Sequence, residues 1–256
     1  MNTSEIEKFQ QKIEKLVSVY SPISLSEMDA VELMNRLDTK YFFTASHLLT
    51  ILQEALPYYR ILEIDNKRQF QYLTRYYDTS NFQLYHDHHN GRLNRYKIRQ
   101  RRYDVTGKEY FEIKFKNNKG QTLKRRIENT QENVLNERAI SFLEKNTPFE
   151  GQELQEVLHN RFIRITLVNK NLTERATLDY ALEFANPSRL VQFPHIGILE
   201  IKQDFETRHS PLKEIMHQLH TNPGSLSKYC TGVASLYHTQ VKINAFKPVL
   251  HKIQSL

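Results

Sequence analysis

The sequence predicts an α+β fold in which about eight antiparallel strands close into a barrel with a cation-lined interior, covered outside by helices. Three observations lead to this prediction. Lys and Arg recur at every second position in several segments that are also rich in Tyr, Phe and Ile. Between these segments lie others in which apolar residues have helical spacing. The composition, 39% hydrophobic and 25% charged over 256 residues, is that of a globular protein with a substantial core.

The clearest strand signal is the segment 95–103, which reads Arg-Tyr-Lys-Ile-Arg-Gln-Arg-Arg-Tyr. Side chains of a strand alternate between its two faces, so one face collects most of the cations. Cations at two-residue spacing repel each other, and such a face therefore requires solvent or an anionic ligand opposite it. The face carries Arg95, Lys97, Arg99 and Arg101. Arg102 is expected on the other face.

Further segments have the composition or alternation of strands. Together with the segment above, the predicted strands lie at 35–43, 69–78, 92–103, 109–116, 122–128, 161–168, 174–184 and 195–203. Apolar periodicity and capping residues predict helices at 5–20, 26–34, 44–56, 79–91, 131–145, 154–158, 212–220 and 227–237. The helices are amphipathic and numerous enough to cover the outside of a barrel.

Two arrangements of the charged faces are compatible with this pattern. In an open antiparallel sheet the charges would face solvent. In a closed barrel they line the interior, and the apolar faces point outward under the helices. The charges are mostly cationic, and the carboxylates among them occur in two Glu-Ile-Lys triplets at 112–114 and 200–202, which favours the barrel.

A lumen of this kind suits a phosphate-rich ligand. Arg makes forked contacts to phosphate oxygens and Lys supplies point charge. One or two carboxylates would hold Mg²⁺ or Mn²⁺, hard cations that bridge phosphate oxygens.

Composition sets the remaining expectations. The formal net charge of +7 favours polyanionic partners. The single cysteine, Cys230, cannot form an internal disulfide, which suggests a cytoplasmic location. No apolar run is long enough for a transmembrane helix, and the first residues lack the apolar run of a signal peptide. We expect an N-terminal helical segment at 1–34, one barrel domain at 35–240 with catalytic function, and a C-terminal tail at 241–256.

An ordered set of short motifs resembles the VTC (vacuolar transporter chaperone) domain family, the polyphosphate polymerase branch of the triphosphate tunnel metalloenzymes. The motifs are Arg36-Leu-Asp-Thr-Lys40, Tyr76-Tyr-Asp-Thr79, Arg95-Tyr-Lys-Ile-Arg-Gln-Arg-Arg-Tyr103, Phe111-Glu-Ile-Lys114, Leu123-Lys-Arg-Arg126, Arg175-Ala-Thr-Leu-Asp179, Leu199-Glu-Ile-Lys202 and Ser227-Lys-Tyr229.

The resemblance implies a tunnel-shaped barrel that transfers the γ-phosphate of ATP to a growing inorganic polyphosphate chain. It implies that Glu200 binds Mn²⁺ or Mg²⁺. The expected catalytic residues are Arg99, Arg101, Lys114 and Arg175. The expected phosphate-binding residues are Lys40, Lys97, Lys124, Arg126, Arg161, Lys202 and Lys228.

Two alternatives remain open at this point. A tunnel triphosphatase would have the same fold and release inorganic phosphate. Hydrolases of the superfamily resemble each other in a Glu-x-Glu-x-Lys first strand, whereas this chain has only Asp38 before Lys40, which favours the polymerase. A non-enzymatic polyanion binder is the other alternative. Specific nucleic-acid binding is not expected, because the aromatic residues alternate onto the face opposite the cations. Eukaryotic relatives resemble a larger assembly, which leaves room for a separate membrane or regulatory partner.

Overall fold

The computed structural model describes the chain except residues 1–2, 30–35, 130–134, 208 and 256. Its centre is one large sheet whose main path is antiparallel at every step. In spatial order the path contains β2 (Arg36–Thr44), β11 (Ile196–Asp204), β9 (Glu174–Asn186), β8 (Leu154–Asn169), β4 (Phe70–Thr79), β5 (Arg95–Tyr103), β6 (Lys108–Lys116) and β7 (Thr122–Glu128). Three short strands extend it: β1 (Pro22–Ile23), β3 (Tyr59–Leu62) and β10 (Arg189–Phe193).

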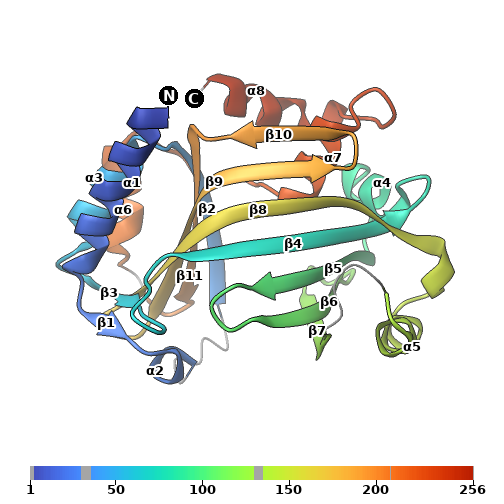
Figure 1. Cartoon of the computed structure of the whole chain (residues 1–256), viewed down its shortest axis with the longest axis horizontal. Coiled ribbons are helices and arrows are strands. Elements are labelled where there is room, and N and C mark those ends of the chain that lie inside the picture. Colours follow the sequence, from blue (N-terminus) through green and yellow to red (C-terminus); the bar gives the residue numbers. More distant parts are fainter. Residues whose placement is uncertain (1–2, 30–35, 130–134, 208, 256) are drawn as a thin grey trace.

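The sheet curves strongly but does not close. In Figure 1, β2 and β11 run steeply behind the long strands β4 and β8, and β5, β6 and β7 turn away below them. The hydrogen-bonded path ends at β2 and at β7, and these two strands do not pair within the described residues. The expected α+β class and antiparallel strands are therefore present, whereas closure into a complete barrel is not seen. A wide trough with a concave inner face takes the place of the closed barrel.

Helices pack on both faces of the sheet in two groups (Figure 1). One group covers the convex side of β2, β8, β9 and β11 through a core of buried aliphatic and aromatic residues; it consists of α1 (Thr3–Ser18), α3 (His47–Ala55) and α6 (Pro211–Gln218). The other lies at one end of the concave side: α7 (Lys228–Leu236) packs on β8, β9 and β10, α4 (Gln83–His89) contacts β4, β5 and α7, and α8 (Lys247–Ser255) lies near α7. α5 (Glu137–Asn146) packs on β6, and α2 (Leu25–Asp29) lies below the sheet at its edge. No described helix combines the length and the apolar character needed to cross a membrane.

The predicted elements agree with the structure except in a few places. The short helix predicted at 154–158 is wrong, because the 3-10 turn Gly151–Glu153 leads directly into β8. The helix predicted at 131–145 begins at Glu137, and residues 130–134 lie outside the described part of the chain. Of the helix predicted at 26–34, the structure describes only the part within α2, because residues 30–35 also lie outside the described part of the chain. β1, β3, β10 and α8 were not predicted.

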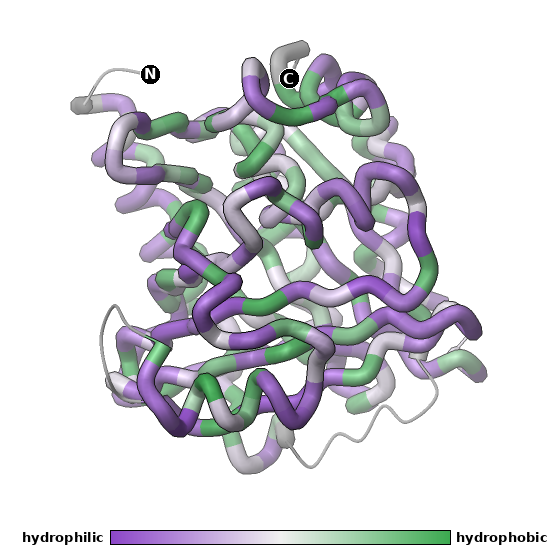
Figure 2. Tube along the Cα trace, turned by 90° about the vertical axis from the view of Figure 1, so that its right-hand side faces the viewer, coloured by the Kyte–Doolittle hydropathy of each residue, from purple (hydrophilic) through white to green (hydrophobic). Residues whose placement is uncertain are grey.

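The alternation of strand side chains follows the predicted register. Figure 2 shows hydrophilic and hydrophobic residues alternating along the strands. In β5, Ile98 and Gln100 are buried on the face opposite the cations, where Ile98 belongs to the core beneath α5. Arg99 and Arg101 point to the concave face, which makes that face the cation-rich one.

Candidate functional site

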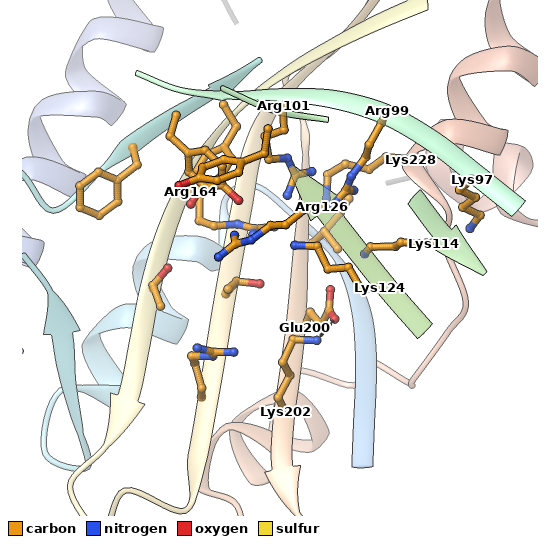
Figure 3. Close-up of a pocket in the computed structure, with 18 of the residues that line it drawn as sticks. Lys97, Arg99, Arg101, Lys114, Lys124, Arg126, Arg164, Glu200, Lys202 and Lys228 are labelled. Carbon is orange, nitrogen blue, oxygen red and sulfur yellow. Dashed lines mark hydrogen bonds and ion pairs between the residues drawn. The ribbon is translucent and has the colours of Figure 1, made fainter. Parts of the chain in front are cut away.

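The concave face of the sheet encloses a cavity of about 860 Å³. Its lining contains fourteen Lys and Arg side chains but only three carboxylates, those of Asp38, Asp104 and Glu200. All eight strands of the main path contribute lining residues, and the start of α7 adds Ser227, Lys228 and Tyr229. Figure 3 shows the labelled cations converging from opposite walls. The site therefore carries a large surplus of positive charge in a confined space.

Every site residue predicted from the sequence lines this cavity except Arg161. Arg161 is exposed and lies on the outer face of β8, where it pairs in register with Leu73 and Glu183. Alternation along β8 puts Phe162 and Arg164 on the inner side instead. The pairing of β8 with β9 also contains a register irregularity between Arg161 and Ile163. Arg164 takes the place that was predicted for Arg161.

A buried carboxylate fixes the cations of β5 and β7. The Nε and Nη2 atoms of Arg99 donate to Glu112 Oε2 at 2.8 and 2.6 Å, and Lys124 Nζ lies 2.5 Å from Glu112 Oε1. Glu112 is 0% exposed. Burial opposes its ionisation, but the charges of Arg99, Arg101 and Lys124 lower the pKa of Glu112 to about 2. Glu112 is thus a permanently charged support that holds two predicted phosphate ligands in place.

Lys114 differs from Arg99 and Lys124, because no described residue pairs with it. It follows Glu112 by two residues on the inner face of β6 and forms no hydrogen bond or ion pair with another described residue. The charge of Arg99 and burial, with a further contribution from Arg101, lower the pKa of Lys114 to about 6. Its amine is available for a ligand, and an anion in the cavity would restore its charge.

An aromatic wall supports the next pair of cations. Tyr72 stacks on Phe162 with ring centroids 5.2 Å apart. Arg101 and Arg164 lie over the Tyr72 ring at 5.4 and 5.0 Å. Arg101 also donates to Thr74 Oγ1 at 3.1 Å. Cation–π contacts of this kind stabilise guanidinium groups without neutralising their charge.

Asp179 bridges Arg164 on the aromatic wall and Lys228 at the start of α7. Arg164 donates to its two carboxylate oxygens at 2.6 and 2.7 Å, and Lys228 Nζ donates to Oδ2 at 2.5 Å. Burial opposes ionisation of Asp179, but the charges of Arg164 and Lys228 lower its pKa. The fork of Arg164 is thereby fixed, and Lys228 reaches the cavity from a helix that packs at one end of the concave face.

The third carboxylate group, Glu200 with Asp38, lies on β11 and β2. Lys202 Nζ is 2.6 Å from Glu200 Oε1 and 3.1 Å from Asp38 Oδ2, and Lys40 Nζ is 3.3 Å from Glu200 Oε1. Burial opposes ionisation of Glu200, but Lys202 and Lys40 lower its pKa, so it remains a carboxylate. This carboxylate is the hard oxygen donor that Mg²⁺ or Mn²⁺ requires.

The donor set fits a metal ion that arrives with phosphate, not an ion bound by protein alone. Among the described residues no group of three or more His, Cys, Asp or Glu side chains could hold a metal. Mg²⁺ is commonly bound by one or two carboxylates together with substrate phosphates, and Glu200 meets that requirement.

Three members of the site were not predicted from the sequence as functional. Glu112 and Asp179 were placed on charged strand faces without a role, and Arg164 was passed over for Arg161. The two carboxylates had a signal in their position: Glu112 alternates in phase with Lys114, and Asp179 alternates in phase with Arg175. A carboxylate on a cation-rich face that is itself buried is expected to bridge cations.

The chain is similar to several solved structures. A putative adenylyl cyclase from Hippeastrum, described as having a dominant triphosphatase activity, aligns with a TM-score of 0.52 and 15% identity over 79% of this chain and 96% of that chain. A putative adenylate cyclase from Vibrio parahaemolyticus gives 0.45 and 15% over 77% and 96%. A Pyrococcus horikoshii protein gives 0.46 and 13% over 79% and 99%. At 15% identity, the similarity to the Hippeastrum protein shows a common fold alone.

Sequence comparison identifies the family. No curated protein matches the chain. The VTC domain matches residues 35–237, which span the sheet from β2 to the end of α7. The match includes every residue that lines the cavity from Asp38 to Tyr229. The chain therefore belongs to the VTC domain family.

Proposed function

We propose that the chain is a metal-dependent polyphosphate polymerase that transfers the γ-phosphate of ATP to the end of an inorganic polyphosphate chain. The observation that carries the proposal is the surplus of cations over carboxylates along the cavity. Burial, with smaller contributions from neighbouring cations, lowers the pKa values of Lys97 and Lys228, whereas the charge of Arg99 and then burial lower that of Lys114. A phosphate chain would relieve the repulsion among these cations, so binding is strongest for a long, highly charged linear anion.

The reaction needs positioning more than covalent help from the protein. A terminal oxygen of the acceptor chain forms a bond to the γ-phosphorus while the bond from that phosphorus to the β–γ bridging oxygen breaks, which leaves ADP. We assign Arg99, Arg101, Lys114 and Arg175 to the β- and γ-phosphates. Their charges stabilise the negative charge on the transferred group and on the leaving ADP.

The other predicted ligands would hold the two chains in line. Lys124, Lys228 and Lys97 lie on the walls around Lys114 and α7 and would guide the acceptor. Bound with phosphate oxygens at Glu200, Mn²⁺ or Mg²⁺ would supply further charge neutralisation at the transferred group.

The test is to incubate the purified protein with ATP and Mn²⁺ or Mg²⁺ and to follow the products by ³¹P NMR. The proposal requires ADP and a polyphosphate signal. Lys114→Met should abolish polymer formation without disturbing neighbours, because no residue in the described part of the chain pairs with Lys114. Arg161→Ala is the matched control, since this cation lies outside the cavity on β8 and its loss should leave the rate unchanged.

A triphosphatase is the second candidate, and the fold shared with the Hippeastrum protein favours it. Water would then replace the acceptor chain at the same γ-phosphate. Free phosphate released in step with ATP loss, without polymer, would establish that alternative. Binding of tripolyphosphate with no turnover of ATP would instead indicate a polyanion-binding domain.

A further inference from the structure

Two sequence motifs that the proposed reaction does not explain meet in the interior. Asp78 belongs to the motif at 76–79 and ends β4, and Tyr229 belongs to the motif at 227–229 and starts α7. The Tyr229 hydroxyl donates to Asp78 Oδ2. Asp78 is 0% exposed and Tyr229 is 2% exposed, so water does not compete for this hydrogen bond.

Asp78 is a buried charge held by hydrogen bonds alone. Its Oδ1 accepts from the backbone N–H of Thr79 at 2.7 Å and of Leu84 at 2.9 Å, and its Oδ2 accepts from Tyr85 N at 3.0 Å. It forms no ion pair with a described Lys or Arg. Burial raises its pKa, while the Tyr229 hydroxyl and the three N–H donors oppose that rise. One carboxylate therefore connects the end of β4, the first turn of α4 and the first turn of α7.

The first turn of α7 is also where the helix meets the cavity. Ser227 caps the helix and accepts from Lys97 Nζ at 3.1 Å. Lys228 Nζ lies 4.6 Å from the centroid of the Phe162 ring and binds Asp179. The Tyr229 ring lies 5.2 Å from the ring of Tyr76, another lining residue.

Packing farther along the helix holds its body against the sheet, where Val233 and Leu236 are buried. Gly232 lies against Phe184 and Leu158, so closely that an added Cβ would be 2.6 Å from Phe184 Cδ1. The hydrogen bond from Tyr229, one residue away from Lys228, to a fixed carboxylate adds a directional restraint at the first turn.

We propose that Asp78 and Tyr229 are positioning residues that orient Lys228 toward the phosphate chain. The inference rests on the proposed function only in that Lys228 binds phosphate. Asp78 fixes the hydroxyl of Tyr229, Tyr229 fixes the rotation of the first turn, and that rotation aims Lys228 at the cavity. Neither Asp78 nor the Tyr229 hydroxyl needs to touch the substrate.

The experiment is a double-mutant cycle on the affinity for tripolyphosphate, measured calorimetrically without divalent cations. Lys228→Met should weaken binding about tenfold, as expected for one charge-assisted phosphate contact. Tyr229→Phe, which removes a single oxygen, should weaken it about fivefold, within the range for residues in one network. The double variant should bind as Lys228→Met does, about tenfold weaker than the unaltered protein, because the hydroxyl acts through the amine.

Two controls separate positioning from general destabilisation. Tyr85→Phe removes another buried hydroxyl of this region, one that donates to Lys242 O at 2.7 Å outside the cavity. It should lower the melting temperature as Tyr229→Phe does and leave the affinity unchanged. Combining Tyr229→Phe with Lys202→Met, on β11, should give the full product of the two single effects.

The outcomes are distinct. Unchanged affinity in Tyr229→Phe, or independent effects of Tyr229→Phe and Lys228→Met, would overturn the inference and leave the hydrogen bond a purely structural one. A second readout needs no ligand: in NMR of ¹³C-methylated lysines, Tyr229→Phe should shift the Lys228 signal but not that of Lys202. Absence of polymer with a normal binding cycle would refute the proposed function and retain the positioning role.

Discussion

Lys114 makes phosphate binding dependent on proton concentration in a way that can be measured. In the empty cavity its pKa is lowered to about 6, chiefly by the charge of Arg99 and then by burial. A bound phosphate chain places negative charge beside the amine, so its pKa returns toward the usual value of about 10.4. Binding should therefore draw a proton from solution.

The size of the effect follows from these two values. At pH 7 an amine with a pKa of about 6 carries about 0.1 proton, and one near 10 carries about one. The uptake at Lys114 is then about 0.9 proton per bound chain. Affinity should rise about tenfold for each pH unit that the solution is lowered between about pH 10 and pH 6, and this contribution should level off below pH 6, where the free amine is already protonated.

Calorimetric titration with tripolyphosphate, in buffers of different ionisation enthalpy, measures this uptake. The ligand also titrates, so the comparison is with Lys114→Arg, in which the side chain is charged throughout. The unaltered protein should take up about 0.9 more proton at pH 7 than this variant. Equal uptake in the two proteins would show that Lys114 is already charged in the empty cavity and would refute the electrostatic reasoning.

Three further predictions concern single substitutions. Arg101→Ala should lower the polymerase rate by about 10²-fold or more, as for loss of one preorganised charge-stabilising donor. Arg102→Ala removes a cation outside the cavity and should leave the rate nearly unchanged. The melting temperatures of both variants are measured alongside to exclude unfolding. Glu200→Gln should abolish turnover yet retain the affinity for tripolyphosphate measured without metal. An unchanged rate at saturating metal would show that Glu200 serves only as an ion-pair partner of Lys202. Gly197→Ala should destabilise the fold by about 1–3 kcal/mol in denaturant unfolding, because the new Cβ would overlap the Phe43 ring; full stability would mean that the ring can move aside.

The sequence was informative wherever a strand has two chemically different faces. In β5 the alternation of cations with Ile98 and Gln100 predicted the inner face correctly, and the same reasoning placed Arg102 outside. Alternation has a period of two, so a single register assignment determines every side chain of a strand. The residues expected at the site were therefore found together, with Arg161 as the exception.

The sequence was misleading where a short apolar segment fits both a helix and a strand, and uninformative where a contact joins residues far apart in the chain. β8 is sixteen residues long and its first residues were taken for a helix, since Val157 and Leu158 are both buried and break the alternation. Pairing of the sheet edges depends on geometry summed over many strands, which the composition of β2 and β7 does not encode. The bridge from Asp78 to Tyr229 joins positions 151 residues apart, and nothing in either motif indicates its partner.

The chain contains one cysteine, Cys230, in the first turn of α7. It is 0% exposed, and burial raises the pKa of its thiol, so the reactive thiolate is scarce and shielded. Alkylating reagents can reach the sulfur only when this turn detaches from the sheet. The rate of alkylation therefore counts the opening events of the helix that carries Lys228, with no label to be engineered. Ligands that bind Lys228 should slow this reaction. The alkylation rate of Cys230 then reports how much of the protein has ligand in the cavity.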